Sequence, residues 1–113
     1  MRIFLTRDVQ VPDLQRLVTR SDLVALACAG AKTEQRRQRR YGEAGDRFTC
    51  GGCAFELVAV YQQRLGDMGD EDARREGFAD LAAYRASLGA VHGAQVWQPD
   101  GQAWVHTFRR VDH

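Results

Sequence analysis

Lysine is almost missing from this chain of 113 residues: Lys32 is the only one, and arginine supplies the other basic side chains. The 16 basic and 15 acidic residues nearly cancel, which leaves a formal net charge of +1. Such a balance excludes a polyanion-binding field around the whole molecule, so any contact with nucleic acid must come from a local cluster. Arginine keeps its proton, whereas lysine can lose it and act as a base. The single lysine is therefore a candidate for chemistry.

Long hydrophobic runs are also absent. No stretch approaches the roughly 20 apolar residues of a membrane helix, and the apolar start at residues 2–5 is soon interrupted by Arg7 and Asp8. We therefore expect a soluble protein that is not exported. The chain has 3 cysteines, an odd number. Without an export signal they predict thiols rather than a disulfide framework, and hence a cytoplasmic protein.

Signatures of metal sites and of common hydrolases are missing. Cys50 and Cys53 frame two glycines and would supply two ligands, whereas a structural zinc site needs four. Cys28 and the histidines follow no recognised spacing, so we expect no metal and no cofactor. A labile disulfide at the Cys50–Cys53 turn is the alternative if the protein meets an oxidant. No Ser-His-Asp order, phosphate-binding glycine loop or pair of hydrolase carboxylates is present.

The length predicts a single domain over residues 1–113, because 44% hydrophobic residues suffice for a modest core. In the first half we expect a strand at 2–5, a helix that begins at Pro12, and a buried helix capped by Ser21 and ended by Gly30. Residues 33–38 should be extended and 39–46 a loop. Strands at 47–50 and 53–65 should form a hairpin around Gly51 and Gly52.

The second half of the sequence predicts two helices and a closing hairpin. Acidic residues 70–72 favour the first turn of a helix that Gly77 stops, and Asp80 caps another that ends at Gly89. Residues 94–98 and 102–109 should pair around a turn at 99–101. Because strands and helices do not alternate regularly, the pattern predicts an α+β fold, antiparallel or a small barrel, rather than a doubly wound sheet.

The stretch 32–40 packs four arginines and Lys32 into nine residues, and such a charged run should face solvent or a ligand. If it is a strand, Gln35 and Arg37 share one face while Glu34 and Arg36 share the other. Arginines here can grip phosphates, and Tyr41 offers a stacking face. The alternative is a solvated loop that keeps the protein soluble.

Two further residues stand out. Glu76 falls in the last turn of its helix, where the helix dipole disfavours a carboxylate. It either shares a proton with Lys32 across a pocket or forms an ordinary ion pair with Arg74, Arg75 or any other arginine in reach. His106 alternates with Trp104 and Phe108, which favours a packed core histidine.

Four segments resemble, in order, the motifs of the ASCH domain family. They are GAKTEQRR at 30–37, GDRF at 45–48, LGDMGDEDARREGF at 65–78 and VHTF at 105–108. The resemblance implies an α+β fold with a small PUA-like antiparallel β-barrel and flanking helices. It also implies a cleft that accepts RNA or a nucleotide.

One branch of the ASCH family hydrolyses the acetyl amide of acetylcytidine with a lysine, a threonine and a glutamate. The lysine falls on Lys32 and the glutamate on Glu76, but the threonine falls on Gln35, which has no hydroxyl. Another part of the family is linked to RNA cleavage.

We therefore expect an RNA- or nucleotide-binding module with a basic cleft. The expected ligand-binding residues are Lys32, Gln35, Arg36, Arg37, Arg40 and Tyr41. The alternative is a small hydrolase of acylated nucleosides or RNA in the same cleft, with Lys32 as base and Glu76 as proton partner. A third hypothesis is an adaptor that binds another protein through the same barrel and does not bind nucleic acid.

Overall fold

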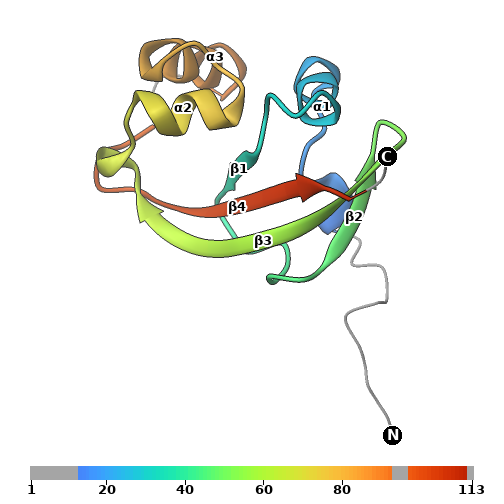
Figure 1. Ribbon diagram of the computed structural model, residues 1–113. Coiled ribbons are helices and arrows are strands. Elements are labelled where there is room, and N and C mark those ends of the chain that lie inside the picture. Colours follow the sequence, from blue (N-terminus) through green and yellow to red (C-terminus); the bar gives the residue numbers. More distant parts are fainter. Residues whose placement is uncertain (1–12, 93–96, 112–113) are drawn as a thin grey trace, which may run out of the picture.

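A curled, four-stranded antiparallel sheet forms the centre of the molecule (Figure 1). The computed structural model describes residues 13–92 and 97–111. The strands are β1 (Glu34–Arg37), β2 (Arg47–Cys50), β3 (Cys53–Arg64) and β4 (Gln102–Arg110), in the order β1-β4-β3-β2. The sheet covers half of a barrel, and helices flank it. The predicted antiparallel α+β fold is confirmed.

Helices α2 (Asp70–Glu76) and α3 (Leu81–His92) lie together over one end of the sheet, and α1 (Ser21–Cys28) lies to one side of them (Figure 1). Arg20, just before α1, donates a hydrogen bond to Ser87 of α3 at 2.7 Å. Several helices begin or end where local sequence signals predicted. Gly30 and Gly77 have φ of 84° and 105° after α1 and α2. The Asp80 carboxylate accepts a hydrogen bond from the Ala83 N–H at 2.9 Å.

Three predicted helix features are wrong. Ser21 does not cap α1 but is its first residue, and Arg20 at the N-cap position forms no side-chain capping hydrogen bond. Instead of a helix from Pro12, the described chain forms a short 3₁₀ helix, η1 (Leu14–Arg16), which buries Leu14. Helix α3 does not end at Gly89 but continues to His92. An interior glycine costs a helix only about 1 kcal/mol, which packing against α2 can offset. A second 3₁₀ helix, η2 (Leu65–Asp67), follows β3.

The hairpin between β2 and β3 forms as predicted. Cys50 lies opposite Cys53, and the two turn glycines have φ of 59° and 80°. Both values are in the left-handed region that this two-residue turn requires. A Cβ atom on Gly51 would lie 2.4 Å from Cγ1 of Val24. Helix α1 therefore packs directly on the turn.

The predicted closing hairpin is wrong, because β4 has β1 on one side and β3 on the other. Trp97 and Gln98 belong to no strand. The other residues of that predicted strand, 94–96, and the predicted first strand at 2–5 lie outside the described residues.

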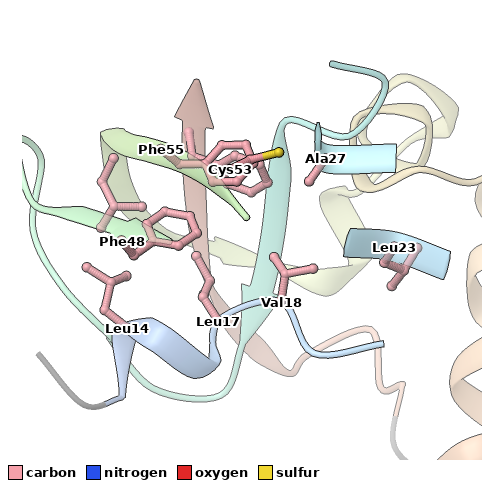
Figure 2. Packing of buried hydrophobic residues seen from close by; sticks show 10 residues of the cluster. Leu14, Leu17, Val18, Leu23, Ala27, Phe48, Cys53 and Phe55 are labelled. Carbon is pink, nitrogen blue, oxygen red and sulfur yellow. The ribbon is translucent and has the colours of Figure 1, made fainter. Parts of the chain in front are cut away.

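The main core is formed where η1 and α1 meet the sheet (Figure 2). Phe48 and Phe55 stack with ring centroids 5.3 Å apart, and Phe108 contacts both rings edge-on. Only Leu23 and Ala27 of α1 are buried, so this helix is less enclosed than its apolar sequence predicted. Met68, Ala73 and Tyr84 form a second cluster in the region of α2 and α3.

The cysteines do not follow the prediction. Cys28 at the end of α1 and Cys53 at the start of β3 form a disulfide with a Cα–Cα distance of 5.9 Å, and Cys50 is a free thiol. The packing of α1 on the hairpin joins two residues 25 positions apart, which sequence spacing does not reveal. The thiol argument for a cytoplasmic location therefore fails. No helix among the described residues is long and apolar enough to cross a membrane.

Candidate functional site

Strand β1 divides the basic stretch between two sides of the sheet, as the alternation predicted. Glu34 and Arg36 are buried and form ion pairs with residues of α2. On the opposite side, Arg37 donates from Nε and Nη2 to the Leu17 carbonyl at 3.2 and 2.7 Å. The two sides therefore have different environments and different chemistry.

Four ionic side chains form a buried cluster between β1 and α2. Their exposed fractions are 0% for Lys32, 5% for Glu34, 2% for Arg36 and 2% for Glu76. We call these four residues the buried ion cluster. The expectation that charge keeps the whole stretch 32–40 out of the interior is wrong for Lys32, Glu34 and Arg36. Two cations and two anions compensate one another, which makes their burial tolerable.

Lys32 and Glu76 meet, which was one of the two predicted alternatives, but both side chains are buried. Lys32 Nζ lies 3.1 Å from Glu76 Oε1, and it also donates to the carbonyl oxygens of Glu34 and Glu76, both at 2.7 Å. An ammonium group has three protons, so all three are used. Burial lowers the pKa of Lys32 despite the neighbouring carboxylate of Glu76. A lowered pKa suits a base, but the side chain has no solvent-exposed surface.

The same contacts explain a carboxylate at the end of α2. Lys32 brings a positive charge to the carbonyl of Glu76, where the helix dipole is negative. Arg36 Nη1 lies 3.0 Å from Glu76 Oε2, so each carboxylate oxygen has its own cation. The predicted alternative, an ion pair with any arginine in reach, is also found, because Arg36 fills that place. Arg74 and Arg75 pair instead with Glu71, Glu34 and Asp72.

Arg36 links the cluster to β3. Its Nε donates to Gln63 Oε1 at 2.9 Å, and Nη2 lies 3.4 Å from Asp72 Oδ1 without a hydrogen bond. Burial alone would lower the pKa of Arg36, but the carboxylates of Glu76 and Glu34 outweigh it and raise the pKa. The guanidinium therefore stays charged. These residues form a buried network of ionic contacts and hydrogen bonds between the sheet and α2.

On the other side, arginines cover two aromatic rings. The guanidinium carbon of Arg39 lies 4.7 Å and that of Arg37 5.5 Å from the Tyr41 ring centroid. The guanidinium carbon of Arg40 lies 5.7 Å from the ring centroid of Trp104 on β4. We call Arg37, Arg39, Arg40, Tyr41 and Trp104 the basic–aromatic surface. Its aromatic residues are half-buried, and Arg39 and Arg40 are 56% and 46% exposed.

Both exposed arginines already have acidic partners. Arg39 pairs with Asp13 at 2.6 Å, and Arg40 pairs with Glu43 at 3.3 Å. Hydrogen bonds from Arg39 and Arg16 lower the pKa of Asp13 to about 2. Exposed pairs of this kind contribute little to stability.

The side chain of His106 contacts Tyr41. It is 0% exposed, which confirms the predicted core histidine. Its Nε2 accepts the Tyr41 backbone N–H at 3.0 Å, and the two rings meet edge-on. The Nδ1 atom lies 3.2 Å from the Gln35 carbonyl, so we assign the neutral tautomer with its proton on Nδ1. Burial lowers the pKa of His106, which keeps this tautomer.

The predicted site residues thus separate into two groups. Lys32, Arg36 and Glu76 meet in the buried ion cluster, whereas Arg37, Arg40 and Tyr41 lie on the opposite side. Gln35 forms no hydrogen bond with Lys32 or Glu76 in the described structure, and its Oε1 is buried without a partner.

Three residues of these two regions were not among the predicted site residues. Glu34 belongs to the buried ion cluster, Asp72 lies next to it, and Trp104 belongs to the basic–aromatic surface. Strand alternation pointed to Glu34, but nothing local pointed to the other two. Across residues 13–92 and 97–111, no three His, Cys, Asp or Glu side chains gather as metal ligands would.

Comparison with known proteins supports the fold. No family model and no curated protein sequence matches the chain. The crystal structure of an ASCH domain from Lactobacillus crispatus JV V101 superposes with a TM-score of 0.69 at 14% identity, over 81% of this chain and 72% of the other. A DUF984 protein from Enterococcus faecalis V583 gives a TM-score of 0.55 at 18% identity, over 80% and 68%. The chain therefore has an ASCH-like fold.

Proposed function

We propose that this protein is an ASCH-type module that binds RNA or a nucleotide through the basic–aromatic surface. One observation carries the proposal: two exposed arginines each lie over an aromatic ring, Arg39 over Tyr41 and Arg40 over Trp104. Arginine binds phosphate through two parallel hydrogen bonds, and a base can stack on a guanidinium plane as well as on an aromatic ring. Single-stranded RNA offers both groups at once.

The buried residues then have a supporting role. Lys32 and Arg36 hold β1 against α2 and do not contact the ligand, in contrast to the set expected from the sequence. Arg37 is committed to the Leu17 carbonyl and lies over Tyr41, so it positions the ring. Arg39 and Arg40 exchange Asp13 and Glu43 for phosphate oxygens.

A salt titration tests this proposal. Short single-stranded RNAs would be titrated into the wild type and into the Arg39→Gln/Arg40→Gln variant at several salt concentrations. Phosphate contacts release counterions, so wild-type affinity should fall as salt rises, and the slope of log affinity against log salt should be shallower by about 1.4 in the variant, because each phosphate contact with a single strand contributes about 0.7. Tyr41→Leu should weaken binding with little change in this slope.

The matched control is Arg74→Gln/Arg109→Gln, which removes two arginines that also form exposed ion pairs, with Glu71 and Glu56. It should leave binding close to that of the wild type. Absence of salt-sensitive binding by the wild type, or equal losses in the two double variants, would sink the proposal.

Hydrolysis of an acylated nucleoside or of RNA is the second candidate, and the contact between Lys32 and Glu76 favours it. Burial lowers the pKa of Lys32, so a neutral amine could take a proton from water and share it with Glu76. Substrate reaches Lys32 only if the buried ion cluster opens. Acetylcytidine and related compounds would be incubated with wild type and with folded Lys32→Met. Turnover by the wild type alone supports this candidate, whereas equal turnover or none removes it.

A further inference from the structure

The 3 cysteines of the chain lie together at the turn between β2 and β3. Cys28 and Cys53 form the disulfide, with their Cα atoms 5.9 Å apart, and Cys50 keeps a free thiol. Cys28 Sγ lies 3.7 Å from the carbonyl oxygen of Cys50 and 3.8 Å from that of Gly51. The sulfur atom of Cys53 points from β3 towards α1 (Figure 2). The free thiol therefore belongs to a residue that borders the disulfide.

Cys53 has a second cysteine within bonding range. Cys50 and Cys53 lie directly opposite each other in the strand register. Directly opposite residues of an antiparallel pair have Cα atoms about 4.5–5.5 Å apart and side chains on the same face of the sheet. A disulfide needs Cα atoms about 4.4–6.8 Å apart. Both Cys28 and Cys50 therefore meet the distance requirement for a bond to Cys53.

We propose that the thiol of Cys50 exchanges with the disulfide, so that Cys53 is bonded either to Cys28 of α1 or to Cys50 across the hairpin. In this step the Cys50 thiolate forms a bond to Cys53 Sγ, and the bond between Cys53 and Cys28 breaks. Cys28 leaves as a thiolate and takes up the proton that Cys50 lost. One disulfide and one thiol exist before and after, so neither an oxidant nor a reductant is consumed. In the product, this disulfide no longer joins α1 to the sheet.

The surroundings of the two sulfur atoms affect the rate. Arg110 Nη1 donates to the Cys28 carbonyl at 2.7 Å, so a cation lies beside the residue that leaves as a thiolate. Burial raises the pKa of Cys50, which lowers the fraction of the attacking thiolate. We therefore expect the exchange to take minutes to hours, as uncatalysed disulfide rearrangements do.

The packing of α1 controls which partner Cys53 has. Cys28 reaches Cys53 because α1 packs on the turn, where Val24 lies against Gly51. Cys50, in contrast, stays opposite Cys53 for as long as the hairpin persists. The bond to Cys28 should therefore predominate while α1 is packed, and loosening of α1 should move the bond to Cys50.

Mapping of the free thiol measures the exchange. The wild type would be held in buffer without reductant, quenched with acid, alkylated with a maleimide and digested, and mass spectrometry would identify the labelled cysteine. Most label should be on Cys50, with a smaller share on Cys28 that grows in urea below the unfolding transition. Val24→Ala, which removes a methyl group next to the turn, should raise the Cys28 share several-fold. The matched control, Val58→Ala at an exposed position of β3, should resemble the wild type.

A cysteine variant tests whether the alternative bond can form. Cys28→Ser retains Cys50 and Cys53, and after reduction it should form a disulfide within one molecule when exposed to oxidised glutathione. Failure of folded Cys28→Ser to do so would overturn the proposal, and so would label confined to Cys50 in the wild type and in Val24→Ala. Label on Cys53 instead of Cys28 would mean that Cys28 pairs with Cys50, which contradicts the exchange. A rate proportional to protein concentration would also contradict it, because the proposed step takes place within one molecule.

Discussion

At the scale of single residues, Lys32 has the most consequential environment. Its ammonium group donates three hydrogen bonds to acceptors on β1 and α2, and its charge balances that of Glu76 in the buried ion cluster. A buried ion pair adds little compared with apolar packing, but loss of one partner leaves an uncompensated charge in the interior. The cluster therefore should tolerate loss of a whole pair better than loss of one member.

Lys32→Met tests this directly. We expect the free energy of unfolding in urea to fall by about 3 kcal/mol or more, because Glu76 keeps only Arg36 as its cationic partner. Lys32→Met/Glu76→Gln should cost less than the sum of the single changes, with a coupling of at least about 1 kcal/mol. Arg109→Met, which breaks an exposed pair with Glu56, should cost no more than about 1 kcal/mol. Equal losses from Lys32→Met and Arg109→Met would contradict this account.

His106 should make stability depend on pH. Burial, with Arg37 and Arg40 nearby, lowers its pKa below the usual 6.5. As pH falls, the unfolded chain therefore takes up this proton before the folded one does, so stability decreases from about pH 6.5 down to the folded pKa. One proton gives a slope of at most about 1.4 kcal/mol per pH unit.

The measurement is urea unfolding of the wild type and of His106→Gln at a series of pH values. His106→Gln should be less stable at neutral pH, since it loses the contacts with Gln35 and Tyr41, but its stability should decline less between pH 6.5 and the range where carboxylates titrate. Parallel declines in the two proteins would show that His106 is not responsible.

At the scale of helices and strands, sequence signals worked where they are local. Glycines that need a positive φ ended α1 and α2 and turned the β2–β3 hairpin, and a carboxylate capped α3. Alternation along β1 placed Glu34 and Arg36 on one side and Gln35 and Arg37 on the other. Each of these signals needs only a few neighbouring residues.

Signals that depend on distant segments were ambiguous or silent. Lys32 and Glu76 are 44 positions apart, and the sequence offered their contact as one of two alternatives. The position of β4 between β1 and β3 depends on sheet closure, so a local turn suggested the wrong partner. Cys28 joins Cys53 only because α1 packs on the hairpin turn.

That disulfide should stabilise α1 on the sheet. Closing a loop between residues 25 positions apart lowers the entropy of the unfolded chain, so reduction should lower the free energy of unfolding by about 3 kcal/mol. Cys50→Ser should respond to reductant in the same way. Alkylation of the denatured wild type should modify one cysteine before reduction and three after it; three before reduction would contradict the pairing.

At the scale of the whole molecule, a nearly neutral protein holds its charges in separate environments. In the stretch 32–40, Arg36 belongs to the buried ion cluster on one side of β1. Arg37, Arg39 and Arg40 belong to the basic–aromatic surface on the other side. The net charge of +1 does not reveal this division, because it sums buried and exposed charges alike. Strand alternation within β1 separates the two roles.

Stability and RNA binding should therefore respond to different substitutions. Lys32→Met should lower the free energy of unfolding and leave the RNA affinity of the folded protein unchanged, because Lys32 has no exposed surface. Arg39→Gln/Arg40→Gln should do the reverse, because the ion pairs of both arginines are exposed and contribute little to stability. Urea unfolding and RNA titration of the same preparations measure the two quantities. If folded Lys32→Met loses RNA binding, the ligand contacts the buried ion cluster after it opens, and the basic–aromatic surface is not the binding site.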